Sequence, residues 1–494
     1  MKPYGWLLLF ASLCGSLAET PPIQRAPAKK AAAPAGPLSV RISRILADKA
    51  AKEAFWGIEV RDQKSGRVLY ALNADRFFVP ASNTKLFTTA LAMTRLGPGY
   101  QFHTRVIRSG RDLVLVGAGD PNLSGRTIPY EPLSPEPAPL AAINQLADEI
   151  AARGIKHIDG EIIGDDTAFV YEPYAPGWGL SDTFSDDGPP ISAICVDDNV
   201  AELQVIPAVE NGTPVQTTWQ LPFELYPIDN AANTKGEGRG NIRYQRMPGS
   251  HTLRLWGSLP AGSPSDLLAL PVDDPARFAA QALKDSLLRR GIVTDGQAIA
   301  RHQLPGSPDL SPLTGDLVAE RVSVPIEQAA QVVDKISQNL HAEMLLRDVA
   351  LKVAGKGTRE GGLAELAQFL KEAGVDPEGV HFSDGSGLSR YNIVTPHAIA
   401  GLLHYMAESP VRDQWIALLP IGGVDGSLRA RFKALRLNGE IHAKTGSLTH
   451  VSALSGYAVR KDGTTVDFSI LVNNYGVSTA AVREVIDRLA AAIL

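Results

Sequence analysis

Two short motifs that lie far apart in the sequence constrain the fold of this chain most strongly. Ser82 and Lys85 form a Ser-x-x-Lys motif at the start of an apolar, helix-like run, and Ser337 and Asn339 follow a second helix-like run. Residues 86–336 separate the two motifs. This connection is too long for a loop inside one compact domain. If both motifs belong to one domain, the sequence predicts that further structure is inserted between its two halves.

The first motif has the spacing of a nucleophile and its base. Residues three apart lie on one face of a helix, so Nζ of Lys85 can reach Oγ of Ser82, and a helix N-terminus favours negative charge developing at the serine. A lysine can accept the hydroxyl proton when burial and a nearby cation lower its pKa. Taken alone, the motif is better explained by a serine that caps a helix.

A third motif strengthens the catalytic interpretation. Lys444, Thr445 and Gly446 end a strand-like run. Ser-x-x-Lys, Ser-x-Asn and Lys-Thr-Gly, in this order, are the signature of penicillin-binding proteins and class A β-lactamases. Further stretches support the same comparison, namely residues 117–121, 176–178, 337–346, 384–390 and 423–428. The chain after its leader resembles the class C low-molecular-mass penicillin-binding proteins, the D-alanyl-D-alanine carboxypeptidase/endopeptidase family.

The resemblance implies an α+β fold. Its catalytic, transpeptidase-like domain has an antiparallel sheet with helices, and it is interrupted by two nested inserted domains. We expect the catalytic domain at 38–97 and 313–494, inserted domain II at 98–199 and 264–312, and a small β-rich domain III at 200–263. The tight turn at 461–463 predicts antiparallel neighbours for the strands on either side of it.

The N-terminal residues predict export. Residues 1–18 have the basic start, short apolar core and small-residue end of a signal peptide, and 19–37 is a Pro- and Ala-rich linker. Leu13 and Ala11 do not suit a lipoprotein signal at Cys14, and the apolar run is too short for a stable transmembrane anchor. After cleavage Cys195 is the only cysteine, so we expect a buried thiol and no intrachain disulfide. The expected location is periplasmic or otherwise extracytoplasmic.

The motif residues suggest a division of labour. Ser82 is the expected nucleophile and Lys85 its base, Lys444 is the second cation, Ser337 relays a proton to the leaving amine, and Asn339 holds the substrate amide and Lys85. The resemblance implies an oxyanion hole built from the backbone N–H groups of Ser82 and Ser447. Lys444 and Thr445 would then bind the terminal carboxylate of the substrate, and Gly446 leaves space for an extended peptide.

The family resemblance also implies recognition of a diamino-acid side chain by the inserted domain. Asp165, with Asp166 as the alternative, is the candidate for its ammonium group, and Arg390 for its carboxylate. A turn aspartate and a solvated arginine explain the same residues without any recognition. The sequence leaves open whether the enzyme trims terminal D-alanine, cleaves cross-links, or does both.

The expected substrates are peptidoglycan peptides, with β-lactam antibiotics as covalent inhibitors. Neither His-Glu-x-x-His nor paired Cys-x-x-Cys occurs, so we expect no metal and no cofactor. The net charge of −5 argues against a nucleic-acid partner. A serine β-lactamase is the first rival, but it needs a deacylating carboxylate and Glu-x-x-Leu-Asn is absent. A catalytically silent wall-binding protein is the second, and the intact motifs argue against it.

Overall fold

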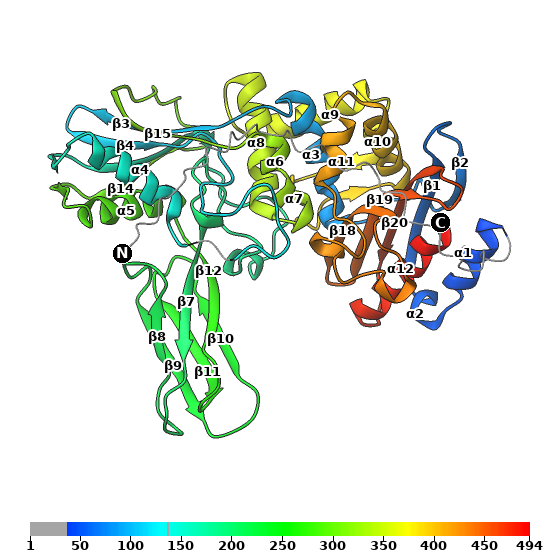
Figure 1. The fold of residues 1–494 in the computed structure, drawn as a ribbon, viewed down its shortest axis with the longest axis horizontal. Coiled ribbons are helices and arrows are strands. Elements are labelled where there is room, and N and C mark those ends of the chain that lie inside the picture. Colours follow the sequence, from blue (N-terminus) through cyan, green and yellow to red (C-terminus); the bar gives the residue numbers. More distant parts are fainter. Residues whose placement is uncertain (1–36, 136–137) are drawn as a thin grey trace, which may run out of the picture.

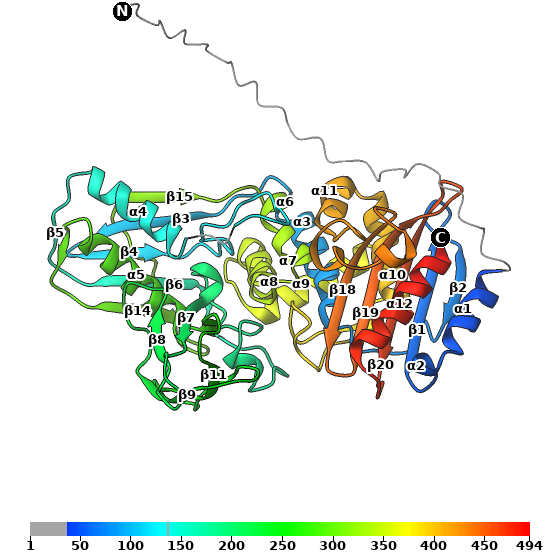
Figure 2. The same ribbon diagram turned by 60° about the horizontal axis from the view of Figure 1, so that its bottom comes forward.

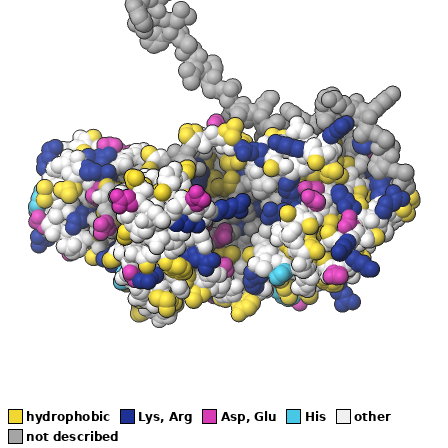
Figure 3. All heavy atoms as spheres, turned by 90° about the horizontal axis from the view of Figure 1, so that it is seen from below, with side chains coloured by type: hydrophobic (Ala, Val, Ile, Leu, Met, Phe, Trp, Pro, Cys, Tyr) yellow, Lys and Arg dark blue, Asp and Glu magenta, His cyan; other side chains and the backbone are white. Residues whose placement is uncertain are grey.

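A computed structural model describes residues 37–135 and 138–494 of the chain. The predicted signal peptide and nearly all of the predicted linker lie outside the described residues. The chain forms two lobes side by side, and a narrow third domain projects from one of them (Figure 1). The face seen from below is hollowed between the two lobes, with acidic and basic side chains interspersed over it (Figure 3).

The first lobe is built on a sheet with the strand order β18-β19-β20-β1-β2. All neighbouring strands in it are antiparallel, as predicted for an α+β fold. The order brings the start of the chain next to its end, because β1 pairs with β20 along its whole length. The strands are β1 (Phe55–Asp62), β2 (Val68–Leu72), β18 (Ile441–Leu448), β19 (Val451–Val459) and β20 (Thr465–Asn473).

Helices cover both faces of this sheet, which explains why its central strands, β19 and β20, are buried at almost every position. On one face Leu454 and Ile470 pack with α1 and α12, and on the other Ala453 and Leu471 pack with the helices around α3 and α10. Figure 2 shows α12 lying along the sheet with α1 beside it. The helices of this lobe are α1 (Leu38–Leu46), α2 (Lys49–Lys52), α3 (Thr84–Arg95), α6 (Ile326–Ala329), α7 (Gln331–Lys335), α8 (Asn339–Ala354), α9 (Arg359–Glu372), α10 (Pro396–Glu408), α11 (Arg412–Leu418) and α12 (Thr479–Ile493).

The inserted lobe has its own sheet and its own core. Its strand order is β14-β6-β4-β3-β15, with α4 and α5 packed against it. The elements are β3 (His103–Ser109), β4 (Asp112–Val116), α4 (Ala141–Ala152), β5 (His157–Ile158), β6 (Ile162–Val170), α5 (Pro275–Leu288), β13 (Val293–Thr294), β14 (Ala298–Gln303) and β15 (Asp316–Val322). Because β15 pairs with β3, this lobe extends to Val322, beyond the expected boundary at residue 312.

The projecting domain is all β and has two three-stranded sheets, ordered β12-β7-β8 and β10-β11-β9. Its strands are β7 (Val200–Ile206), β8 (Gln216–Trp219), β9 (Ile228–Lys235), β10 (Asn241–Arg246), β11 (Leu253–Pro260) and β12 (Asp266–Pro271). Buried and partly exposed positions alternate along β7, and the buried ones, Ala201, Leu203 and Val205, lie in the core of this domain. Since β12 pairs with β7, the domain ends near Pro271, beyond the expected boundary at 263.

Candidate active site

The nucleophile candidate lies in a short turn just before a buried helix. Ser82 is the middle residue of the 3-10 turn Ala81–Asn83, and Lys85 lies in the first turn of α3 with no exposed surface. Nζ of Lys85 is 3.0 Å from Oγ of Ser82, the contact that the spacing predicts. The N-cap position of α3 is Asn83, whose amide donates to the carbonyl oxygen of Lys444 at 2.9 Å. The Ser82 hydroxyl is therefore available for chemistry rather than used as a helix cap.

Lys85 has two further acceptors, and together they orient its amine. Nζ donates to Oδ1 of Asn339 and to the carbonyl oxygen of Ser386, each at 2.6 Å. A neutral lysine amine has two N–H donors and one lone pair. When the two donors are occupied by Asn339 and Ser386, the lone pair is left facing the hydroxyl of Ser82. This is the arrangement that a general base requires.

The electrostatic surroundings bring the pKa of Lys85 close to neutral pH. Burial lowers its pKa first, and the nearby Lys444 cation lowers it further, to about 7. Asp384, Asp334 and Glu343 act in the opposite direction. Near neutral pH, a large share of Lys85 is therefore uncharged and able to accept a proton.

The second and third motifs meet on the other side of the nucleophile. Nζ of Lys444 donates to Oγ of Ser337 at 2.9 Å and to the carbonyl oxygen of Thr445 at 3.1 Å. Burial lowers the pKa of Lys444 to about 8, with Asp334 opposing the shift. Ser337 has a left-handed backbone, with φ of 68°, and lies just before Gln338, the N-cap residue of α8. A proton on Lys444 can therefore pass to the Ser337 hydroxyl and from there into the site.

Strand β18 forms the open edge of the sheet beside the nucleophile. Among the named strands it pairs with β19 alone, and residues 420–422 cover its other edge only at residues 441–443. The second half of that edge, which contains Thr445 to Ser447, can therefore accept an extended peptide. A Cβ atom added at Gly446 would come within 2.6 Å of the Pro80 carbonyl oxygen and 3.2 Å of the Ser82 nitrogen. Only glycine allows the strand to pass so near Ser82. On the same strand, the hydroxyl of Thr445 is 2.8 Å from that of Ser427, and Ser447 accepts from Arg483.

The inserted lobe contributes directly to the second motif. The side-chain amide of Asn339 donates to the carbonyl oxygen of Asp187 at 2.8 Å. The middle residue of the motif, Gln338, donates to Oδ2 of Asp198 at 2.9 Å. Both acceptors belong to the inserted lobe, so that lobe helps to fix the turn from which Ser337 reaches the site.

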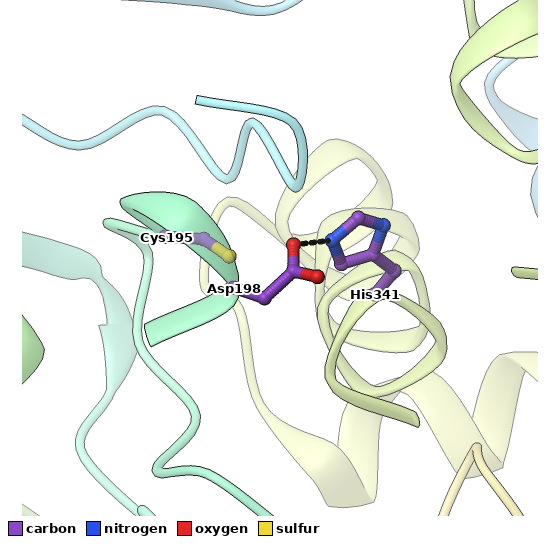
Figure 4. Close-up of side chains that lie close together, drawn as sticks. All are labelled: Cys195, Asp198 and His341. Carbon is purple, nitrogen blue, oxygen red and sulfur yellow. Dashed lines mark hydrogen bonds and ion pairs between the residues drawn. The ribbon is translucent and has the colours of Figure 1, made fainter. Parts of the chain in front are cut away.

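Asp198 is the centre of this junction (Figure 4). One oxygen lies 2.8 Å from Nε2 of His341 on α8, and Arg126 binds both oxygens. Burial alone would raise the pKa of Asp198, but His341 and Arg126 hold it well below its usual range. Together with the buried thiol of Cys195, Asp198 and His341 have the composition of a metal site. The carboxylate is already neutralised by a guanidinium and hydrogen-bonded to the imidazole, so this cluster fits a structural tie between the two lobes better than a metal site.

The predicted specificity residues lie in different lobes, with Asp165 and Asp166 in the inserted lobe and Arg390 in the first lobe. Asp165 lies in β6, where its carboxylate accepts from Arg301 at 2.7 Å and from Thr167 at 2.6 Å. The alternative, Asp166, is buried against Ser192 and His302. These partners all belong to the inserted lobe, so both carboxylates already accept hydrogen bonds within that lobe.

Arg390 lies in the first lobe and is exposed to solvent. Its backbone N–H donates to the carbonyl oxygen of Gly177 at 3.3 Å, and the neighbouring Ser389 hydroxyl donates to the Pro176 carbonyl at 2.7 Å. The Arg390 loop is thus held against the 176–178 segment of the inserted lobe. The Arg390 guanidinium remains accessible to a ligand.

The sequence alone does not reveal the groups that act through a backbone atom or that position another residue of the site. The carbonyl of Ser386, the hydroxyl of Ser427 and the carboxylate of Asp384 belong to stretches that carry the family resemblance, but nothing in their residue types shows their roles. Asp384 accepts from the backbone N–H groups of Gly387 and Ser389 and from the indole N–H of Trp178, and so shapes the loop that faces Lys85.

The fold and the site define a penicillin-binding enzyme of the serine-peptidase type. The model of the D-Ala-D-Ala carboxypeptidase 3 (S13) family matches residues 38–493, so the chain belongs to this family. It is 33% identical, over 466 residues, to a D-alanyl-D-alanine carboxypeptidase of Actinomadura sp. (strain R39), a match that covers 90% of this chain and 82% of that protein.

Three further comparisons agree with this assignment. The chain is 25% identical to D-alanyl-D-alanine carboxypeptidase DacB of Haemophilus influenzae, with 85% of each protein covered. A crystal structure of penicillin-binding protein 4 (dacB) from Haemophilus influenzae has the same fold, with a TM-score of 0.77 at 23% identity and coverage of 91% of this chain and 97% of that one. The same protein has also been solved in complex with a β-lactam, at a TM-score of 0.72 and 22% identity, over 91% of this chain and 97% of that one. The family favours a peptidase over the β-lactamase alternative.

Proposed function

We propose that this protein cleaves the D-alanyl-D-alanine end of peptidoglycan stem peptides through an acyl-enzyme on Ser82. Oγ of Ser82 attacks the carbonyl carbon of the penultimate D-alanine, and its proton passes to the neutral amine of Lys85, 3.0 Å away. The negative charge that develops on the carbonyl oxygen is stabilised by the backbone N–H groups of Ser82 and Ser447. The observation that carries this proposal is the pair of acceptors that turns the Lys85 lone pair toward Ser82.

The leaving group is the amine of the terminal D-alanine. As its C–N bond breaks, the amine takes a proton from the hydroxyl of Ser337, which regains one from Nζ of Lys444 at 2.9 Å. Before the second step Lys85 gives up the proton that it took from Ser82, and Lys444 regains the one that it lost, both by exchange with solvent. A water molecule then attacks the ester at Ser82, Lys85 accepts a proton from that water, and the proton passes to Oγ as Ser82 leaves as the hydroxyl. One peptide bond is hydrolysed for each water consumed.

The substrate is proposed to lie beside β18 as an extended strand. Its terminal carboxylate is bound by Lys444 and by the hydroxyl of Thr445, which Ser427 orients. β-Lactams would enter by the same path, because their strained amide occupies the place of the D-alanyl-D-alanine bond. Arg390 is proposed to bind the carboxylate of a diamino-acid side chain, and Asp165 remains the sequence-based candidate for its ammonium group.

The proposed location is outside the cytoplasm, in the periplasm or an equivalent compartment, because peptidoglycan is found there. Within residues 37–135 and 138–494, no helix has the length and apolarity needed to cross a bilayer.

The proposal is tested by product analysis with defined peptidoglycan fragments. The purified protein is incubated with a stem pentapeptide ending in D-alanyl-D-alanine, and separately with a cross-linked dimer. Release of D-alanine from the pentapeptide, absent in Ser82→Ala, supports the proposal. Cleavage of the dimer shows endopeptidase activity as well. A wild-type protein that is folded but leaves both substrates intact would overturn it.

A further inference from the structure

A buried carboxylate that the proposed reaction does not use lies directly behind the base. Glu343 is on α8, one turn beyond Asn339, and has no exposed surface. Its Oε1 accepts from the backbone N–H groups of Gly385 at 2.9 Å and Ser386 at 2.8 Å. Its Oε2 accepts from the Arg347 guanidinium at 3.0 Å. Burying a carboxylate costs free energy, and the three N–H donors around Glu343 offset this cost.

These contacts hold the one backbone carbonyl on which the Lys85 geometry depends. Ser386 is fixed on both sides: its own N–H is bound by Glu343, and the next N–H, that of Gly387, donates to Asp384 at 2.8 Å. The carbonyl between them accepts from Nζ of Lys85 at 2.6 Å. If Ser386 moved, Lys85 would lose one of the two acceptors that leave its lone pair facing Ser82.

The hydrogen bonds favour the ionised form of Glu343, because both of its oxygens accept from N–H donors. Burial raises its pKa, with Asp384 adding to the shift and Arg347 opposing it. Besides Glu343, the titratable groups that act on the base Lys85 are Asp384, Asp334 on α7 and Lys444 on β18.

We propose that Glu343 is a positioning residue for the base: it holds the Ser386 carbonyl, and its negative charge acts on Lys85. This inference rests on the proposed function, since it concerns the same acylation step. The direction of the charge effect on the pKa of Lys85 is known. The negative charge of Glu343 raises this pKa, whereas burial and the Lys444 cation lower it. Loss of the charge must therefore move the pKa of Lys85 further down.

The test is the rate of acylation by a chromogenic penicillin, measured as a function of pH under single-turnover conditions. Glu343→Gln should reduce the rate at the plateau roughly a hundredfold, the effect of a misplaced catalytic group. The acidic limb of the pH–rate profile, where the rate rises as Lys85 loses its proton, should also move to lower pH in this variant. The reason is that an amine of lower pKa stays neutral in more acidic solution. Glu343→Asp keeps the charge but is too short to reach both N–H groups, so it should lower the plateau and leave the limb in place.

Asp467→Asn is the matched control, because Asp467 is a buried carboxylate that is not among the groups acting on Lys85. It should leave the pH profile unchanged. A folded Glu343→Gln protein with the wild-type plateau and limb would overturn the proposal, as would failure of both Glu343 variants to fold, since Glu343 would then serve stability alone. If the wild-type protein itself is not acylated at Ser82, the proposed function fails instead.

Discussion

Nζ of Lys444 donates a hydrogen bond to Oγ of Ser337 at 2.9 Å, although the two residues are 107 positions apart. Lys444 comes from the edge strand of the sheet, and Ser337 from the turn that begins α8. The contact places a cation next to the proton relay and near the base. A second cation at Lys85 is thereby disfavoured, so the two lysines divide the work: Lys85 takes a proton while Lys444 supplies one.

The acylation rate should therefore depend on pH with a rising acidic limb. Lys85 acts as a base only when it is neutral, and its pKa is about 7. Below that pH the rate should fall by about tenfold for each pH unit, because the neutral fraction falls by that factor. The measurement is the rate of penicillin acylation between about pH 5 and pH 9. This range extends about two pH units to either side of the pKa of Lys85. A rate independent of pH across this range is not compatible with Lys85 as the base.

Replacing the base by a permanent cation should abolish acylation but not folding. In Lys85→Arg the guanidinium stays charged at all accessible pH values and offers no lone pair. We expect the acylation rate to fall by roughly two to four orders of magnitude, the usual range for losing a general base. Circular dichroism and thermal unfolding would report folding. Near-normal acylation in a folded variant would remove Lys85 from this role.

Gly446→Ala tests how closely β18 must approach the nucleophile. The added Cβ would lie 2.6 Å from the Pro80 carbonyl oxygen, so the strand or the Ser82 turn must move. A displacement of this kind should reduce acylation by about a hundredfold. Gly476→Ala is the control, since a Cβ there meets nothing within 4 Å. Equal activities of the two variants would show that the close approach is not needed.

The specificity residues are separated by comparing two substrates. Arg390→Ala should slow the cleavage of peptides that carry a free diamino-acid end, while acylation by a simple penicillin stays nearly unchanged. Asp165→Ala should do the same if Asp165 binds the ammonium group. If the carboxylate serves Arg301 instead, Asp165→Ala should lower the unfolding temperature and leave the substrate preference intact. Equal losses on both substrates would indicate general damage to the site.

Asp198→Ala should destabilise the junction between the lobes. The substitution removes the carboxylate that Arg126, His341 and Gln338 share. Breaking a fully buried ion pair typically costs about 3–5 kcal/mol. The side chains of Asp198 and Arg126 are 15% and 24% exposed, so we expect a smaller loss of stability, which urea unfolding can still measure. The exposed Asp295, which pairs with His157, is a suitable control, and Asp295→Ala should have little effect. Unchanged stability of Asp198→Ala would contradict the role assigned to this cluster.

Much of the fold and the core of the site could be predicted from the sequence. The Ser82–Lys85 contact follows from helical spacing, and the strands at β19 and β20 follow from apolar runs around a tight turn. The expected boundaries at 312 and 263 fall too early in the chain, because β15 and β12 pair with strands far away in the sequence, and local patterns do not show such pairing. The role of the Ser386 carbonyl cannot be predicted for a related reason. Every residue has a backbone carbonyl, and only the fold brings this one to Lys85.

The central claim is that Ser82, activated by Lys85, forms the acyl-enzyme. The most direct measurement is intact-protein mass spectrometry after exposure to a penicillin, followed by peptide mapping of the adduct. The account predicts a single adduct of the mass of the penicillin, located on Ser82 and absent from Ser82→Ala. An adduct on another residue, or an unmodified folded protein after long exposure to several penicillins, would contradict it.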